Sequence, residues 1–370
     1  MKQNLALYRK YRPQTFSEIV NQERVVKTLT GALSQDKTSH AYLFVGPKGT
    51  GKTTMARLLA KALNCENRKD GEFEPCNKCS SCQQIDKNQA VDLIEIDAAS
   101  NRGIDDIREI KENAQFTPNQ SKYKVFIIDE SHQLTKGAAN ALLKILEEPP
   151  AHVVFILATT EPEKMIPTIV SRCQKFYFKN LPVSLIQKRL AKILKAESIK
   201  HEDGALTLIA QNSQGSLRNA ETLLEEAISF AITEDKEKIT KEGVKDLVGL
   251  VEIKAIGKLI DFIFDDEIKK ALSFLDEIIE EGSKPEEIGR NIINYLRKIL
   301  LLQIKADLDN IDLLDFTDEE KKALQERAQN YSVQDLQKNI DLFLAAQKQI
   351  TISPIGQLPL ELAIVKSIKG

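Results

Sequence analysis

Long apolar runs are missing from this sequence of 370 residues, and their absence argues against a membrane protein. The longest run, Val153 to Ala158, has the length of a strand, whereas a membrane-spanning helix needs about 18 consecutive apolar residues. The opening residues, MKQNLALYRKYRP, contain no apolar signal-peptide core and no small-residue cleavage site. We therefore expect no membrane segment and no export signal, and a protein that stays in the cytoplasm.

Compositional bias is also absent. Hydrophobic residues make up 42% of the chain and charged residues 29%, which excludes collagen-like, low-complexity and disordered classes. No internal repeat and no low-complexity linker interrupts the sequence. At about 100 to 200 residues per domain, this length predicts two or three domains.

The net charge of −2 is close to zero, but the two halves of the chain differ. Residues 1–180 carry 26 Lys and Arg against 21 Asp and Glu, a net +5, and residues 181–370 carry 26 against 33, a net −7. The first half can contact phosphates, but this excess is too small to identify a nucleic-acid partner. On charge alone, a solvated surface of mixed charge is the simpler interpretation.

Short apolar runs alternate with segments of helical periodicity in the first half of the chain. Because the runs are almost continuously apolar, they predict an α/β fold with a parallel sheet covered on both faces. The predicted strands are residues 42–45, 92–96, 124–128, 153–158 and 175–178.

Helical patterns replace the strand pattern after Leu181-Pro182. One apolar stripe at three-to-four spacing consists of Leu185, Ile186, Leu190, Ile193 and Leu194. From about Val244 the chain is helical again, with a helix that includes 261–281 and ends at Gly282 as a C-cap. Further helices are expected around 287–303, 318–329 and 333–349 and from about Leu360.

The segment GPKGTGKT lies between the strand YLFV and the helical run TMARLLAKALN. Glycines in this context let backbone N–H groups surround phosphate oxygens, and the helix adds its positive N-terminal end. Lys52 supplies a charge for the terminal phosphates, and the Thr53 hydroxyl can ligate Mg²⁺. The residues expected to contact the nucleotide here are Gly46, Pro47, Lys48, Gly49, Thr50, Gly51, Lys52, Thr53 and Thr54.

A second strand, KVFIIDE, ends in the acidic pair Asp129 and Glu130. Asp129 can hold Mg²⁺ or its water shell, and Glu130 can polarise a water molecule for attack on the terminal phosphate. Together with Lys52, this pair predicts nucleotide hydrolysis as well as binding.

Four of the five cysteines lie in one polar insertion, within a span of eighteen residues. They are Cys65, Cys76, Cys79 and Cys82. Four thiolates at these spacings match a closed, structural zinc site, and a reducing compartment disfavours disulfides. An iron–sulfur cluster is the competing interpretation, although no proline follows the last cysteine. The distant Cys173 is most simply a small buried hydrophobic residue.

These motifs resemble the gamma/tau subunit family of the bacterial DNA polymerase III clamp loader, which belongs to the AAA+ ATPases. The resemblance covers essentially the whole chain, and the cysteine insertion, which AAA+ proteins in general lack, is its most discriminating part. The segments that carry it are YRKYRPQTFSEIVNQE, GPKGTGKT, the cysteine insertion, IEIDAASNRGIDDIREI, FIIDESHQLTKGAANALLKILEEPP, FILATTEPEKMIPTIVSRCQKF and GSLRNAETLLEEA.

The resemblance implies an ATPase domain over residues 1–180 with a zinc module at about 64–84, a helical lid domain over 181–242 and a helical collar domain over 243–370. It implies ATP, Mg²⁺ and structural Zn²⁺ as ligands. The implied partners are the delta and delta-prime subunits and further gamma/tau copies in a ring of five, the sliding clamp and primer–template DNA. ATP-bound rings of this family open the clamp, and DNA-triggered hydrolysis releases it.

The resemblance also assigns residues. Arg172, in Ser171-Arg172-Cys173, matches the arginine finger that reaches the neighbouring subunit's nucleotide. Thr160 matches the residue that senses the terminal phosphate, with the adjacent Thr159 as the alternative, and Arg218 matches the lid-domain sensor. The segment that borders adenine and ribose matches Tyr8, Arg9, Tyr11, Arg12 and Pro13, and the expected DNA contacts are Arg102 and Lys136.

Two other interpretations are open. A non-hydrolysing subunit of the same assembly is disfavoured by the intact Lys52, Thr53, Asp129 and Glu130. A different AAA+ machine, such as a branch-migration helicase, is disfavoured by the cysteine insertion and by Ser171-Arg172-Cys173. We expect the helicase and polymerase contacts of the family's long form to lie beyond Gly370.

Overall fold

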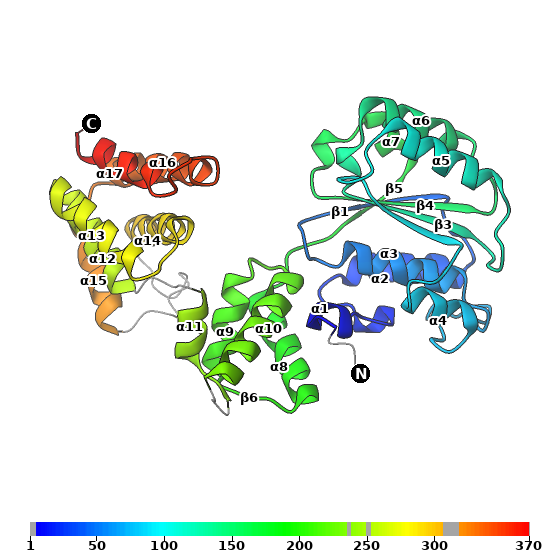
Figure 1. The fold of residues 1–370 in the computed structure, drawn as a ribbon, viewed down its shortest axis with the longest axis horizontal. Coiled ribbons are helices and arrows are strands. Elements are labelled where there is room, and N and C mark those ends of the chain that lie inside the picture. Colours follow the sequence, from blue (N-terminus) through cyan, green and yellow to red (C-terminus); the bar gives the residue numbers. More distant parts are fainter. Residues whose placement is uncertain (1–4, 235–237, 249–252, 306–317, 370) are drawn as a thin grey trace. The chain divides into compact units, whose positions relative to one another are not determined.

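The computed structural model describes residues 5–234, 238–248, 253–305 and 318–369 (Figure 1). The chain divides into two compact units with the boundary between Val244 and Lys245. Among these residues, two hydrophobic cores lie on the sheet of the first unit and another lies in the second unit. Within the described residues, no helix combines the length and the apolar character needed to cross a membrane.

A parallel five-stranded sheet organises the first unit, with the strand order β2-β3-β4-β1-β5. All five strands lie within one residue of the ranges that the apolar runs predict, so the expected α/β fold is confirmed. The strands are β1 (Ala41–Val45), β2 (Leu93–Asp97), β3 (Lys124–Asp129), β4 (Val153–Thr159) and β5 (Gln174–Tyr177).

Helices cover both faces of the sheet, which explains why its central strands are apolar throughout (Figure 1). Along β1, Tyr42 and Phe44 pack into one core, and Leu43 and Val45 pack into the other. The first core includes α2 (Glu23–Ser34) and α3 (Lys52–Leu63). The second includes α5 (Ile104–Gln115), α6 (Lys136–Glu147) and α7 (Pro167–Arg172).

The strand order places three chemically important strand ends at one edge. In the parallel register Val45 of β1 lies opposite Thr159 of β4, and Ile128 of β3 lies opposite Leu157 of β4. The residues that follow β1, β3 and β4 therefore emerge side by side at the carboxyl edge of the sheet, where open α/β sheets bind ligands.

Short elements surround this sheet. They are α1 (Leu7–Lys10), η1 (Phe16–Glu18), α4 (Ser80–Asp86), η2 (Ser131–Gln133) and η3 (Pro162–Lys164). The helix α4 belongs to the cysteine insertion and contacts α3.

A small helical region completes the first unit. It consists of α8 (Val183–Glu197), α9 (Asp203–Asn212) and α10 (Leu217–Thr233), and α11 (Lys241–Val248) crosses the unit boundary. The predicted stripe of α8 is buried except for the half-buried Leu185. The sequence pattern did not predict the short parallel pair β6 (Lys200–His201) and β7 (Lys238–Ile239), whose strands are two residues each.

The described part of the second unit is helical and packs around one core (Figure 1). The last four helices lie within two residues of the predicted positions. The helices are α12 (Ile253–Phe264), α13 (Ile268–Glu280), α14 (Pro285–Lys305), α15 (Asp318–Asn330), α16 (Val333–Ile350) and α17 (Leu358–Lys369).

The single helix expected over 261–281 is wrong, because the chain turns between α12 and α13. Asp266 takes the left-handed conformation with φ of 58°, and the Glu267 N–H donates to the Phe262 carbonyl at 2.9 Å. Aspartate tolerates this conformation, so a helix can end there without glycine. The predicted end of α13 is confirmed, since Gly282 has φ of 99° and the Ser283 N–H donates to the Ile278 carbonyl.

A polar network joins three helices of the second unit. The Arg327 guanidinium donates two hydrogen bonds of 2.7 Å to the Asp261 carboxylate and a third to the Tyr295 hydroxyl. The Tyr331 hydroxyl also donates to Asp261 at 2.7 Å. Burial raises the pKa of Tyr295 to about 12, so this hydroxyl stays neutral beside the ion pair.

We predict that Asp261→Ala lowers the free energy of unfolding by about 1 to 3 kcal/mol, because a partly buried guanidinium loses its bidentate partner. Urea denaturation followed by circular dichroism measures the change. Asp276→Ala, on the exposed side of α13, is the matched control and should change it by less than about 0.5 kcal/mol. Equal losses in both variants would contradict the prediction.

Candidate functional site

The loop after β1 has a shape that depends on glycine. Gly49 and Gly51 have φ of 76° and 99°, and Gly51 is the N-cap of α3. A Cβ atom on Gly49 would come within 2.0 Å of the Ser216 Oγ atom. The loop therefore needs glycine for its backbone conformation at both positions and for space at Gly49.

Lys52, the first residue of α3, is held inside this loop. Its side chain is 5% exposed, and its ammonium donates to the Gly46 and Pro47 carbonyls at 2.7 and 2.9 Å. Burial lowers the pKa of Lys52, and the carboxylates of Glu130 and Asp129 oppose that shift. A phosphate oxygen is a stronger acceptor than these carbonyls, because both partners are then charged.

Thr53 and Asp129 meet although they are 76 residues apart in the sequence. The Thr53 hydroxyl donates to the Asp129 carboxylate at 2.7 Å, and the Glu130 N–H donates to its other oxygen at 2.9 Å. Hydroxyl and carboxylate oxygens are ligands of the kind that Mg²⁺ prefers. These two side chains therefore fit a magnesium ion that accompanies a nucleotide.

Glu130 lies beside Thr160 at the carboxyl edge of the sheet. Its backbone is left-handed, with φ of 46°, and its carboxylate accepts a hydrogen bond of 3.0 Å from the Thr160 hydroxyl. The neighbouring Thr159 is fully buried, and its hydroxyl contacts the His132 ring at 3.0 Å. Of the two adjacent threonines, Thr160 is therefore the one that faces the acidic pair.

The sequence did not single out His132, which is packed against this pair. Its side chain is 3% exposed, with Nδ1 3.5 Å from a Glu130 carboxylate oxygen and Nε2 3.1 Å from a Glu161 carboxylate oxygen. No spacing rule identified it, because its contacts with Thr159 and Glu161 come from β4 and from the loop that follows β4.

A pocket opens where the phosphate loop, the acidic pair and α10 meet. Most of the predicted nucleotide residues line it, but Gly46, Pro47, Arg9, Tyr11, Thr160 and Arg172 do not. The lining residues are Tyr8, Arg12, Pro13, Glu18, Ile19, Val20, Lys48, Gly49, Thr50, Gly51, Lys52, Thr53, Thr54, Asp129, Glu130, Leu181, Arg189, Leu217, Arg218 and Glu221.

The start of α10 touches the phosphate loop directly. The Leu217 N–H donates to the Gly49 carbonyl at 3.1 Å. The Arg218 guanidinium lies 4.8 Å from the centre of the Tyr8 ring, a distance at which a cation is attracted to the aromatic face. Arg218 and Tyr8 thus form adjoining parts of the pocket wall, and Arg218 offers a positive charge to a bound anion.

Glu221 and Arg189 are pocket residues that the sequence analysis missed. Glu221 is 5% exposed, and one of its carboxylate oxygens lies 3.7 Å from Arg189 Nε. Burial raises the pKa of Glu221 to about 7, against the opposing charges of Arg189 and Arg12. In an amphipathic helix, a single glutamate is ordinarily a surface residue, so the pattern contained no signal for this buried one.

The first helix is attached to helices α8 and α10. The Tyr11 hydroxyl and the Lys10 ammonium each donate to the Glu197 carboxylate at 2.5 Å. The Leu7 N–H donates to Glu225, and Arg189 donates to the Tyr11 carbonyl. These bonds place Tyr8 in the pocket wall while Arg9 is exposed.

Arg172 ends α7 and is not among the residues that line the pocket. Its guanidinium pairs with Glu147 of α6 at 2.6 Å and donates to the Thr168 carbonyl at 2.9 Å. The two residues expected to contact DNA, Arg102 and Lys136, are both exposed. Their backbones lie near each other in space, because the N–H of Thr135, which precedes Lys136, donates to the Arg102 carbonyl.

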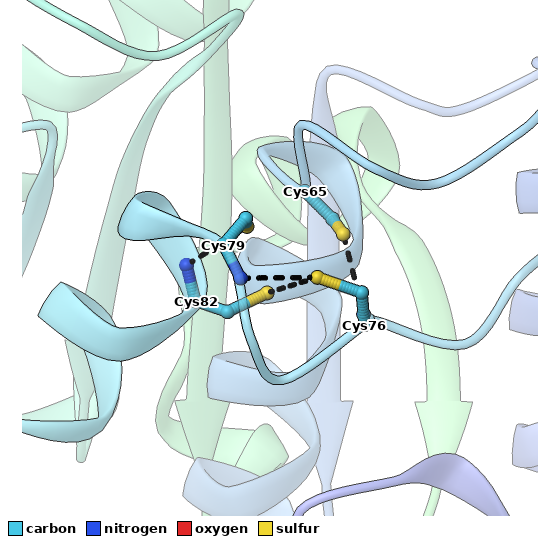
Figure 2. Close-up of side chains that lie close together, drawn as sticks. All are labelled: Cys65, Cys76, Cys79 and Cys82. Atoms are coloured by element: carbon cyan, nitrogen blue, oxygen red, sulfur yellow. Dashed lines mark hydrogen bonds between the residues drawn. The ribbon is translucent and has the colours of Figure 1, made fainter.

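The four clustered cysteines converge on one point (Figure 2). Cys65 follows α3, Cys76 and Cys79 lie in the insertion loop, and Cys82 belongs to α4. Their sulfur atoms all lie within 4.8 Å of one another, and four ligands at 2.3 Å around zinc would be about 3.8 Å apart. The residues therefore fit a closed tetrahedral metal site.

Backbone N–H groups support the thiolates. Burial opposes ionisation of Cys76, but hydrogen bonds from the N–H groups of Lys78 and Cys79, together with those from the thiols of Cys65 and Cys79, lower the pKa of this thiol to about 6. Burial raises the pKa of Cys82. Cys173 is buried in the core with α5, α6 and α7, which confirms the expectation of a small hydrophobic residue.

Comparisons with protein families match most of the chain. The model of the DNA polymerase III delta subunit matches residues 21–182. The ATPase lid domain of the DNA polymerase III clamp loader subunit matches residues 185–232, and domain III of the DNA polymerase III gamma and tau subunits matches residues 239–369.

Curated relatives match over nearly the full chain. DNA polymerase III subunit tau of Bacillus subtilis is 42% identical over 98% of this chain and 62% of its own length. The corresponding tau subunit of Escherichia coli is 36% identical over 98% of this chain and 55% of its own length. DNA polymerase III subunit gamma of Buchnera aphidicola is 36% identical over 98% of this chain and 97% of its own length. The chain thus spans a little over half the length of the two tau subunits.

Solved structures support the fold. The Holliday junction branch migration motor RuvB of Thermotoga maritima has a TM-score of 0.50 and 20% identity over 68% of this chain and 78% of its own. At this identity the likeness shows the fold alone, a parallel sheet with helices on both faces. The sequence relatives and the three family models show more: the chain belongs to the gamma/tau subunit family of the DNA polymerase III clamp loader.

Proposed function

We propose that this chain is an ATP-hydrolysing motor subunit of the clamp loader. The observation that carries the proposal is the convergence of Lys52, Thr53, Asp129 and Glu130 at one pocket, with Arg218 of α10 on its wall. Phosphate, metal and water need different groups, and this pocket offers one for each.

In this proposal the phosphate loop receives the triphosphate and Lys52 exchanges its loop carbonyls for phosphate oxygens. Thr53 and Asp129 would hold Mg²⁺, which polarises phosphate oxygens when bound. Glu130 orients a water molecule and accepts its proton as the water attacks the terminal phosphorus. The bond between that phosphorus and the bridging oxygen breaks, and ADP leaves with the electron pair.

Two further residues respond to the terminal phosphate. The Thr160 hydroxyl, which donates to Glu130 at 3.0 Å, could donate to the phosphate instead and so report its presence. Arg218 would draw α10 toward the bound nucleotide by its charge. The base and ribose would meet the wall that contains Tyr8, Arg12 and Pro13.

The proposed assembly is a ring of five subunits with delta, delta-prime and further gamma/tau copies. The three domains of this chain would be the ATPase domain of residues 1–180, the lid of 181–242 and the collar of 243–370. In the ring, Arg172 would leave Glu147 and reach the neighbouring subunit's nucleotide, where it offsets the charge of the transferred phosphoryl group.

The proposed cycle couples this chemistry to a clamp and to DNA. Binding of ATP would let the ring open the sliding clamp, and primer–template DNA would trigger hydrolysis and release. Arg102 and Lys136 are the proposed DNA contacts, because both are exposed at the starts of neighbouring helices.

We further propose that the cysteine cluster binds one structural zinc ion. All four positions are filled by thiolates from the protein, so no site is left for a substrate. The role of such a site is to hold the insertion in its fold.

ATP hydrolysis by the chain assembled with its partner subunits tests the proposed function. We expect stimulation by clamp and primed DNA together. A Lys52→Ala chain should bind no nucleotide, since the charge that faces the phosphates is lost, and a ring built from it should lose ATP hydrolysis. An unstimulated wild-type ring, or unchanged ATP affinity in Lys52→Ala, would contradict the proposal.

Arg172→Ala should leave ATP affinity within about twofold and slow hydrolysis in the ring by about a thousandfold, which is typical for loss of an arginine finger. The exposed Arg108→Ala is the control. Mixed rings of Arg172→Ala and Lys52→Ala chains should recover part of the activity, because an intact pocket can then meet an intact arginine. Full activity of Arg172→Ala rings would refute the role in trans.

Elemental analysis should find about one zinc per chain. Cys79→Ala should lose the metal and lower the melting temperature, since three thiolates hold zinc more weakly than four, whereas Cys173→Ala should keep it. Iron in place of zinc would reverse the assignment, and full zinc content in Cys79→Ala would exclude that cysteine as a ligand.

A further inference from the structure

One carboxylate connects the cysteine insertion to the segment before α2. Glu74 accepts hydrogen bonds from the Phe16 N–H at 2.8 Å, the Ser17 N–H at 2.9 Å and the Ser17 hydroxyl at 2.7 Å. These partners are 57 and 58 residues from Glu74 in the sequence. Three bonds to one charged group are stronger than the same bonds to a neutral one.

The segment that Glu74 holds is also a wall of the nucleotide pocket. Pro13 lines the pocket before Phe16, and Glu18, Ile19 and Val20 line it afterwards. Phe16 is 1% exposed and belongs to the core shared with α2 and α3. Phe16 and Ser17 lie between the two pocket-lining stretches. They are therefore held in place by the buried Phe16 ring and by the Glu74 carboxylate.

Residues of the insertion before and after Glu74 in the sequence hold this residue in place. Glu74 lies two residues before Cys76, whose sulfur lies in the cluster of four, and Phe73 packs against the same core as Phe16. On the other side Arg68 donates to the carbonyls of Leu33, Ala62 and Glu72. A metal bound by the cysteines would therefore set where the Glu74 carboxylate lies.

We propose that Glu74 is a positioning residue through which the cysteine cluster supports the ATP pocket. The metal-bound insertion places Glu74, Glu74 holds Phe16 and Ser17, and these hold the pocket wall formed by Pro13, Ile19 and Val20. This inference rests on the proposed function, because it requires the pocket to bind ATP. It gives the insertion a role in nucleotide affinity in addition to its own folding.

The test compares Glu74→Gln with Asp70→Asn, which removes a charge from an exposed position of the same insertion. Affinity for a fluorescent ATP analogue is measured on the full chain with zinc bound and after chelation. Glu74→Gln should bind about tenfold more weakly, because its amide NH₂ replaces an acceptor of backbone N–H groups. Its kcat at saturating ATP in the assembled ring should be unchanged, and Asp70→Asn should match the wild type.

Removal of zinc should weaken binding of the ATP analogue to the wild type about as much as Glu74→Gln does. In the Glu74→Gln chain, removal of zinc should cause little further weakening, since both changes act through one contact. Independent, multiplying effects would show that the carboxylate does not transmit the metal's influence and would overturn the inference. Unchanged affinity in zinc-bound Glu74→Gln would also overturn it.

A second variant separates positioning from folding. If Glu74→Gln loses zinc or melts at a lower temperature, Ser17→Ala decides, because it removes one of the three bonds and leaves the insertion intact. We expect about threefold weaker binding, and no change would overturn the inference. A wild-type chain that binds no ATP analogue would refute the proposed function itself, whereas normal wild-type binding with unaffected variants refutes only the role of Glu74.

Discussion

The parallel register of β1, β3 and β4 is the constraint on which the site depends. It brings the phosphate loop, the acidic pair and Thr160 to one edge of the sheet although more than 100 residues separate the first from the last. The bond between Thr53 and Asp129 forms only because those strands lie in this order. A shift in register would separate the residues proposed for phosphate, metal and water.

Sequence patterns predicted the functional residues that belong to short, continuous motifs. The strands followed from apolar runs, and the phosphate loop and Asp129-Glu130 followed from their position at strand ends. Glu221, Arg189 and His132 could not be found in this way, because their partners lie on other elements and single charged residues in helical patterns are usually exposed. Only the fold shows that these three are largely buried.

The break between α12 and α13 illustrates a second limit of pattern analysis. Apolar residues continue at helical spacing on both sides of Asp265-Asp266, so periodicity predicts one helix. The turn depends on a left-handed Asp266, which local sequence permits but does not require. Gly282, by contrast, gave a correct helix end because glycine is the usual residue in that conformation.

Residues 5–18 are attached at two places. Leu7 and Tyr11 are bonded to α8 and α10, while Phe16 and Ser17 are bonded to the insertion beside α3. Arg12, Pro13, Gln14 and Thr15 form the short tether between these attachments. If α8 and α10 move away from the sheet, Tyr8 must move with them while Phe16 stays in place, so the pocket would open along this tether. Entry and departure of a nucleotide would then be limited by how far four residues of backbone can stretch.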